Sequence, residues 1–335
     1  MNERKLLTGI IVFVVIIIGG ILAFTPGFML FGVQKNEPLK IGLVVWPGFG
    51  PYYVAQEKAF FDKDGISQVE FITVDIITAQ SALASGALDV VSLTPPEVAV
   101  LSDKIQIKVI GATDTSRGAD GIVAVADIKN IEDLKGKKIA VEIGTASHFL
   151  LLYLLDKAGL SSSDVILTDT TAPDAGVAFV SGDVDAGVTW EPWLSKAASE
   201  REGGHILATT EGNPIIPALI IVRDDTLKKK SDQIKVLMKG WYRGLEYIEQ
   251  NPDESYMIMS RQFEVSSEEF REIKKGIEWF DYNRTLEYFG TVENPGMALE
   301  LINKAGDLWV REGLTENKPN AKEIVDFSLL KNLYK

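Results

Sequence analysis

The sequence predicts an α/β protein of two similar lobes, each built around a parallel sheet. The first observation is an internal repeat: residues 85–97 and 181–193 share the pattern Ser-Gly-x-x-Asp and a later proline, and such repeats indicate two copies of one architecture. The second is the alternation of short apolar runs with helical patterns from residue 39 onward. The third is length, because a chain of 335 residues is too long to fold around one small hydrophobic core. Two such lobes usually face each other across a cleft that holds a ligand.

The N-terminal segment predicts a membrane anchor. Residues 6–24 carry no charge and follow Arg4 and Lys5, and a helix of that length crosses about 30 Å of hydrocarbon. We therefore expect a cytoplasmic N-terminus over 1–5, a transmembrane helix over 6–24, a linker over 25–38 and an extracytoplasmic remainder at the cell membrane. A cleaved signal peptide is the alternative, although no clear Ala-x-Ala-like site follows the apolar stretch.

The first lobe is expected over residues 39–125. Its strands are predicted where apolar runs occur, and its helices where amphipathic segments follow them. The strands lie at 39–46, 69–74, 89–93 and 106–111. The helices lie at 52–62, 77–85 and 97–101, the first of them after a loop at 47–51 that is rich in glycine and proline.

The second lobe is expected over residues 126–217, with the same order of elements. Its strands are predicted at 138–143, 165–169, 186–190 and 205–209, and its helices at 145–158 and 174–181. The apolar run at 218–222 indicates that the chain then returns to the first lobe, to which 218–335 belong. Three further helices are predicted there from apolar positions three and four residues apart. They lie at 231–250, 268–275 and 297–310, the last two as surface helices.

Composition excludes several classes of function. The formal net charge of −13 argues against nucleic acid or an anionic membrane surface as a partner. The chain has no cysteine, which excludes disulfides, thiolate metal sites and a lipidated cysteine. His148 and His205 are not spaced as zinc ligands, and no nucleophile elbow, phosphate loop or dinucleotide motif occurs. We therefore expect a binding protein with no metal, no cofactor and no catalytic residues.

Residues just after the predicted strands are candidates for binding a ligand, because parallel strands present their carboxyl ends at the cleft. The segment 144–148 joins a glycine to hydroxyls at a helix N-terminus, which favours an anion; the alternative is that Thr145 simply caps the helix. Glu191 could neutralise an ammonium group or be an ordinary acid in a first helical turn. The full set of candidates is Trp46, Gly48, Tyr52, Thr94, Asp114, Thr145, Ser147, His148, Trp190 and Glu191.

Five segments together resemble the nitrate, sulfonate and taurine group of ABC-transporter substrate-binding proteins (NitT/TauT-like, NMT1-like). They are residues 46–55, 57–61, 85–90, 144–148 and 184–193, and the resemblance covers roughly 39–247. It implies a type II periplasmic-binding-protein fold, in which two crossovers join lobes that close over a small ligand. It also implies a permease and an ATPase as partners.

The resemblance also implies a ligand class. Segment 144–148 looks most like the taurine and aliphatic-sulfonate members, whereas Glu191 departs from the taurine pattern. Our hypothesis is a small organic anion or zwitterion, taurine or another aliphatic sulfonate, held between Trp46 and Trp190. Its anionic end would meet residues 145–148. The alternatives are nitrate, bicarbonate or a thiamine-precursor pyrimidine, a membrane-anchored ligand sensor, or an enzyme of thiamine-precursor biosynthesis.

Overall fold

The computed structural model describes residues 37–63 and 66–335, and residues 37–335 form one compact unit. The transmembrane helix expected over 6–24 lies outside the described residues, as does nearly all of the expected linker. Within the described ranges, no helix has both the length and the apolar character needed to cross a bilayer.

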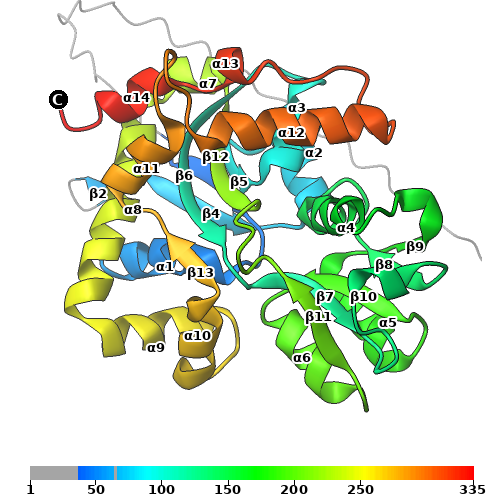
Figure 1. Cartoon of the computed structure of the whole chain (residues 1–335). Coiled ribbons are helices and arrows are strands. Elements are labelled where there is room, and N and C mark those ends of the chain that lie inside the picture. Colours follow the sequence, from blue (N-terminus) through cyan, green and yellow to red (C-terminus); the bar gives the residue numbers. More distant parts are fainter. Residues whose placement is uncertain (1–36, 64–65) are drawn as a thin grey trace, which may run out of the picture. The chain divides into compact units, whose positions relative to one another are not determined.

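The first lobe contains a six-stranded sheet in the order β13-β6-β12-β5-β1-β4 (Figure 1). Its strands are β1 (Leu39–Leu43), β4 (Val69–Thr73), β5 (Val90–Leu93), β6 (Ile107–Ser116), β12 (Pro217–Arg223) and β13 (Ile277–Trp279). The parallel part centres on β1, where Ile41 pairs with Phe71 on one side and Val90 on the other. These strands are apolar because helices cover both faces of the sheet.

The second lobe contains a five-stranded sheet in the order β11-β7-β10-β8-β9. Its strands are β7 (Asp120–Ala124), β8 (Lys138–Val141), β9 (Ile166–Asp169), β10 (Ala186–Trp190) and β11 (His205–Thr209). Strands β8, β9 and β10 are parallel to one another, as expected, whereas β7 and β11 are antiparallel to their neighbours.

Both sheets are therefore mixed, and the expectation of purely parallel lobes is wrong for β7, β12 and β13, which run antiparallel to their neighbours. The chain leaves β6 and enters β7 through residues 117–119, and it leaves β11 and enters β12 through 210–216. Strands β7 and β12 follow these extended connections, without the long helical crossover that joins neighbouring parallel strands. The two crossovers lie together, since the Thr210 hydroxyl contacts that of Ser116 at 2.6 Å and accepts from the Gly118 amide at 2.8 Å. The second sheet therefore begins at Asp120, ahead of the boundary expected at residue 126.

Five of the six helices that follow strands in the two lobes were predicted, and α6 was not. In the first lobe they are α1 (Gly50–Glu57), preceded by the 3-10 turn η1 (Pro47–Phe49), then α2 (Ile76–Ser85) and α3 (Pro95–Ser102). In the second lobe they are α4 (Ala146–Lys157), α5 (Ala172–Ser181) and α6 (Trp193–Glu200). The short strands β2 (Asp62–Lys63) and β3 (Ile66–Ser67) pair with each other. The two lobes also contain the 3-10 turns η2 (Ile131–Leu134) and η3 (Ser162–Asp164).

The repeated Ser-Gly-x-x-Asp segment performs the same structural task in each lobe. Gly86 and Gly182 end α2 and α5 in the left-handed conformation, both with φ of 85°, which glycine adopts without steric cost. Asp89 and Asp185 then accept a backbone N–H at the start of β1 and of β8, from Lys40 and Lys138, each at 2.9 Å. The repeat is therefore a helix stop followed by a side-chain link to the neighbouring strand.

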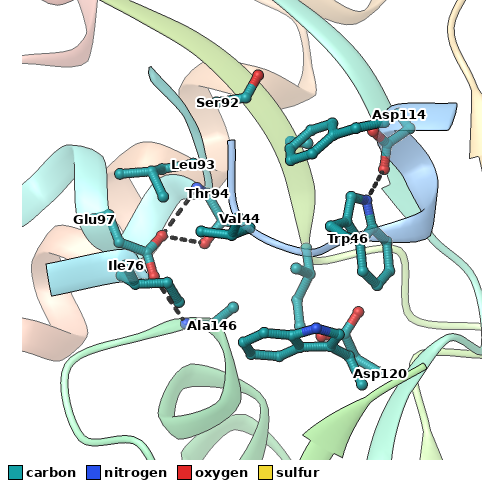
Figure 2. A pocket seen from close by; sticks show the side chains of 14 residues that line it. Val44, Trp46, Ile76, Ser92, Leu93, Thr94, Glu97, Asp114, Asp120 and Ala146 are labelled. Atoms are coloured by element: carbon teal, nitrogen blue, oxygen red, sulfur yellow. Dashed lines mark hydrogen bonds between the residues drawn. The ribbon is translucent and has the colours of Figure 1, made fainter. Parts of the chain in front are cut away.

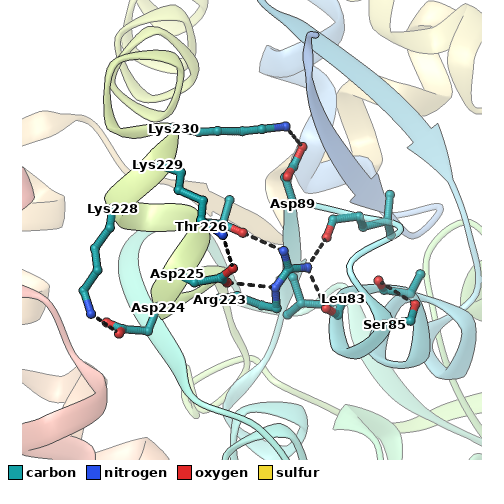
Figure 3. Close-up of polar contacts among 12 residues, drawn as sticks. Leu83, Ser85, Asp89, Arg223, Asp224, Asp225, Thr226, Lys228, Lys229 and Lys230 are labelled. Carbon is teal, nitrogen blue, oxygen red and sulfur yellow. Dashed lines mark hydrogen bonds and ion pairs between the residues drawn. The ribbon is translucent and has the colours of Figure 1, made fainter. Parts of the chain in front are cut away.

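An arginine from elsewhere in the chain clamps each copy of the repeat. Arg223 donates to the Leu83 carbonyl at 3.1 Å (Figure 3) and to the Leu88 carbonyl at 3.2 Å. Arg201 donates in the same way to the carbonyls of Phe179 and Val184, at 2.7 and 2.8 Å. Leu83 and Phe179 lie in the last turn of a helix, and Leu88 and Val184 lie just before the strand that follows it. Asp89 alone gains an ion pair, with Lys230 at 2.7 Å (Figure 3).

The C-terminal part returns to the first lobe as a set of helices. They are α7 (Asp224–Lys229), α8 (Ser231–Gln250), α9 (Pro252–Gln262), α10 (Ser267–Lys275), α11 (Tyr282–Phe289), α12 (Met297–Arg311), α13 (Ala321–Ile324) and α14 (Phe327–Lys331). Helices α8, α10 and α12 were predicted. Helix α12 is not only a surface helix: Trp309 is buried, donates its indole N–H to the Pro96 carbonyl at 3.0 Å and stacks on His148 of the second lobe.

Candidate ligand-binding site

A pocket lies between the two lobes, where the carboxyl ends of β1, β5 and β10 meet the start of α4. The space within it is about 450 Å³, a figure that includes space open to solvent. Both lobes and both crossover strands contribute to its wall (Figure 2). The lining residues are Val44, Trp46, Phe49, Ile76, Ser92, Leu93, Thr94, Glu97, Asp114, Asp120, Ala146, Trp190, Ile216 and Ala218.

Two tryptophans supply large apolar walls, and each is held by its indole N–H. Trp46 donates to Oδ1 of Asp114 at 2.8 Å. Trp190 comes from the second lobe and donates across the cleft to the Val45 carbonyl at 3.0 Å. Both side chains are buried in this conformation, and their hydrogen bonds orient them. The pair predicted from the sequence therefore does line one pocket, together with the predicted Thr94 and Asp114.

Gly48 shapes this wall without lining it. A Cβ atom at this position would lie 2.0 Å from Nε1 of Trp46 and 2.6 Å from Oδ1 of Asp114. The Gly48 carbonyl also accepts the indole N–H of Trp279 at 2.9 Å. The glycine is therefore needed for the close approach of Trp46 to Asp114, which is a structural role rather than the predicted contact with ligand.

Three carboxylates line the pocket: Glu97, Asp114 and Asp120. All three are buried, and burial raises the pKa of each to about 7 because an ionised carboxylate loses its hydration there. Asp114 accepts from Trp46 and from the Thr113 hydroxyl, at 2.8 Å each. Oδ2 of Asp120, by contrast, accepts no hydrogen bond from any residue that the structure describes. No lysine, arginine or histidine occurs among the described residues that line the pocket.

The helix N-terminus expected to hold an anion is occupied by a carboxylate of the protein itself. Glu97 on α3 accepts the Ala146 amide, at the start of α4, at 3.1 Å, and it also accepts the Thr94 amide at 2.9 Å and the Thr94 hydroxyl. In Figure 2 this bridge closes one side of the pocket, opposite Trp46 and Asp114. A negative group is favourable at this position because the helix dipole and free N–H groups attract it. The bridge joins the two lobes.

Thr145, Ser147 and His148 are consequently not in the pocket wall, and the predicted anion cradle is wrong in this conformation. The Thr145 hydroxyl donates to the Glu142 carbonyl at 2.7 Å, and Nδ1 of His148 accepts the Gly144 amide at 3.3 Å. Burial lowers the pKa of His148 to about 4, so its ring is neutral near pH 7. Oγ of Ser147 and Nε2 of His148 are buried without a partner among the described residues.

Tyr52 and Glu191 also have structural roles. The Tyr52 ring is fully buried in the core of the first lobe, 4.7 Å from the ring of Trp241 and 5.2 Å from that of Phe71. Glu191 accepts the amide of Ser195 at 3.2 Å and also its hydroxyl, and it thereby caps the start of α6. Glu191 precedes α6 and its N-cap residue Pro192, so the expected place in a first helical turn is not observed, although its carboxylate accepts hydrogen bonds at the start of that helix.

Sequence reasoning missed Glu97 and Asp120. Glu97 is the fourth residue of the pattern Thr94-x-x-Glu97, which resembles a local capping box and gives no sign of a partner in the other lobe. Asp120 lies at the start of β7, a strand that the sequence did not predict. Comparing the two repeats to locate the strands at which the chain passes between lobes could have located Asp120.

A wider hollow of about 930 Å³ adjoins the pocket and shares Val44, Ile76 and Trp190 with it. Asp75 and Glu142 line this outer part. Asp75 caps α2 through the amide of Thr78, and Glu142 accepts the amide of Ala172 at the start of α5, at 3.1 Å. The path from solvent to the pocket therefore also carries acidic side chains and no lysine, arginine or histidine among its described residues.

Comparison with known proteins places these features in a family context. The model of the family described as NMT1/THI5 like matches residues 46–255. The taurine-binding periplasmic protein of Escherichia coli is 28% identical over 210 residues, which cover 61% of this chain and 64% of the relative. Another Escherichia coli protein, described provisionally as aliphatic sulfonates-binding, is 35% identical over 176 residues, or 52% of each chain.

Solved structures share the fold. The periplasmic aliphatic sulphonate binding protein SsuA of Escherichia coli superposes with a TM-score of 0.72 at 20% identity, covering 89% of this chain and all of that one. The desulfurization enzyme DSZB also has this fold, with a TM-score of 0.63 at 16% identity, covering 88% of this chain and 98% of that one. The two-lobed architecture is therefore that of periplasmic binding proteins, and the architecture alone does not separate binding from catalysis.

Proposed function

Since this chain belongs to the NMT1/THI5-like family, we propose that it is the extracytoplasmic solute-binding component of an ABC importer. It holds a small organic solute between its lobes and delivers it to a permease driven by an ATPase. The pocket between the lobes carries the proposal, because Trp46 of one lobe and Trp190 of the other line the same enclosed space. A ligand between them would contact both lobes and favour the closed form over the open one.

The solute that best suits this pocket is a small zwitterion, with taurine as the first candidate. Two indole faces can cover an organic chain, and the carboxylates of Asp114 and Asp120 can bind an ammonium group. Nitrate and bicarbonate have neither an organic chain nor an ammonium group. A thiamine-precursor pyrimidine remains the second candidate, because a flat amino-substituted ring has both a stacking face and donor nitrogens.

We further propose that the protein binds its solute without transforming it. The chain has no cysteine to act as a nucleophile, and both indole N–H groups at the pocket are engaged in holding the walls. A ligand sensor would share these features and differ in its partner. Affinity capture from solubilised membranes separates the two proposals, since an importer component should retain a permease and an ATPase, and a sensor a kinase.

Residues 6–24 are proposed to anchor the binding unit to the membrane, with the cell exterior on the side of residues 37–335. Protease treatment of intact cells tests this orientation. We expect the folded unit to be accessible to added protease and to remain in the membrane fraction after a salt wash. Release of the unit by salt would count against the anchor.

Calorimetric titration tests the ligand. The compact unit 37–335 is titrated with taurine, ethanesulfonate, nitrate, bicarbonate and an aminopyrimidine. We expect heat with taurine and none with nitrate or bicarbonate. The absence of heat with every sulfonate would remove the sulfonate hypothesis, and heat with the aminopyrimidine alone would establish the second candidate.

A further inference from the structure

Asp120 differs from the other two carboxylates of the pocket in having an unused acceptor. Glu97 and Asp114 each accept at least two hydrogen bonds from the protein. Asp120 is 3% exposed, lines the pocket and has no donor for Oδ2 among the described residues. Burying such an oxygen is costly unless a partner arrives. A donor nitrogen on the bound solute can supply that partner.

We propose that Asp120 binds a cationic nitrogen of the transported solute, an ammonium, amidinium or protonated ring amine, between the faces of Trp46 and Trp190. The proposal rests on the solute-binding function given above and narrows it to one class of ligand. Asp114 supplies a second negative charge at the site. Cations also favour the faces of indole rings, so charge and shape select the same group.

The electrostatic surroundings support a cation and disfavour an anion. The charged groups that face Asp120 are Asp114 on β6, Glu97 on α3 and Glu191 after β10, and all three are acids. Burial, with a smaller contribution from these acids, raises the pKa of Asp120. No basic side chain among the described lining residues balances this charge. A buried carboxylate without a counter-charge is stabilised when a ligand brings one.

The place where an anionic group would otherwise bind is already filled. Glu97 accepts the Ala146 amide at the N-terminus of α4, 3.1 Å away, and so takes the role of an anion there. An anion without a cationic nitrogen, such as nitrate or ethanesulfonate, would have to displace this carboxylate and then lie among the remaining acids. Recognition through a positive nitrogen requires no such displacement.

The cation is organic rather than a metal ion. Within the described part of the chain, no three Asp, Glu or His side chains come together as metal ligands do. The pocket instead offers two aromatic faces and apolar side chains such as Ile76 and Ile216 around its acids. This lining suits a nitrogen attached to carbon, whose substituents need apolar contact.

The test uses pairs of solutes that differ only in the nitrogen: taurine and isethionate, ethanolamine and ethylene glycol, benzylamine and benzyl alcohol. Binding to the full chain in detergent is followed by tryptophan fluorescence, to which the two pocket indoles contribute. We expect the amine of at least one pair to bind about 10- to 100-fold more tightly than its hydroxyl partner, the range for a charged hydrogen bond. Asp120→Asn should abolish that difference, whereas the exposed control Asp127→Asn should leave it unchanged.

A second measurement is pH dependence. The carboxylates must be ionised to bind a cation, so amine affinity should rise between pH 5.5 and 8 in the wild type and rise less in Asp120→Asn. Equal binding of both members of every pair, unchanged affinity in Asp120→Asn, or no binding by any amine overturns the inference. If a solute without a cationic nitrogen binds, the transport function stands and the inference fails. If no solute binds and no permease is captured, the proposed function fails as well.

Discussion

Replacing Asp120 by asparagine should stabilise the ligand-free protein at pH 8, although it weakens ligand binding. The substitution keeps the size of the side chain and removes a buried charge that lacks a full set of donors. Burial raises the pKa of Asp120 from 3.8 to about 7. Each unit of pKa corresponds to about 1.4 kcal/mol, so ionisation of this group costs the folded state about 4 kcal/mol at most.

Part of that gain is lost again in the variant. The asparagine amide brings N–H donors that also lack a partner, at a cost of about 1–3 kcal/mol. The net expectation is a rise of about 1–3 kcal/mol in the free energy of unfolding at pH 8. The sign changes with pH, because the native state holds the proton more tightly than the unfolded state. The contribution of the Asp120 carboxyl group to wild-type stability is therefore greatest below pH 4, and it falls as the pH rises toward 7.

Urea unfolding of both proteins at pH 5 and pH 8 measures the effect. We expect the variant to be more stable at pH 8 and equal or less stable at pH 5, with a smaller dependence on pH overall. Asp127→Asn is the matched control, since its side chain is exposed. A variant that is less stable than wild type at pH 8 would refute the reasoning, because it would mean that the Asp120 carboxylate is already fully partnered within the protein.

Three other substitutions follow from the same site. Gly48→Ala should separate Trp46 from its carboxylate partner, because the new Cβ lies 2.0 Å from the indole nitrogen. We expect the free energy of unfolding to fall by about 2 kcal/mol or more and the tryptophan fluorescence to change. An unchanged fluorescence spectrum would contradict this expectation. Trp190→Ala should weaken solute binding about 30-fold or more, whereas Asp185→Asn, which keeps an acceptor for a strand amide, should change it less than about twofold; comparable losses in a calorimetric titration would argue against a pocket role for the tryptophan. Glu97→Gln keeps one acceptor oxygen in place of two and should raise the ratio of open to closed forms by about 10- to 100-fold. X-ray scattering should then give a larger radius of gyration. Identical scattering would show that the bridge does not hold the lobes together.

Much of the fold could be predicted because its signals are local. The copies of Ser-Gly-x-x-Asp each end a helix and link to a neighbouring strand within one lobe, so sequence and structure agree over these elements. The apolar stripe of α8 and the apolar runs of β5 and β10 also allowed these elements to be predicted from the sequence. Strand β7 was not predicted, since an extended connection between lobes leaves no pattern that differs from a loop, whereas β11 was predicted at its observed bounds.

The site was predicted in part. Trp46, Thr94, Asp114 and Trp190 were located because a strand end near a loop indicates the cleft. Tyr52, His148 and Glu191 have the same local signal but point into the core or cap a helix. The direction of a side chain at a strand end depends on packing between sheet and helix, which the local sequence does not specify.

The sequence by itself determined the two-lobed plan, the repeated helix stop and the presence of tryptophans at the cleft, because each depends on residues near one another in the chain. Only the tertiary structure decided the charge of the pocket. Glu97 meets Ala146 from the opposite lobe, and Asp120 lies beside the crossover that joins the lobes. Both positions depend on how two separately folded sheets approach each other, and it is that approach that excludes water and leaves a carboxylate oxygen in need of a partner.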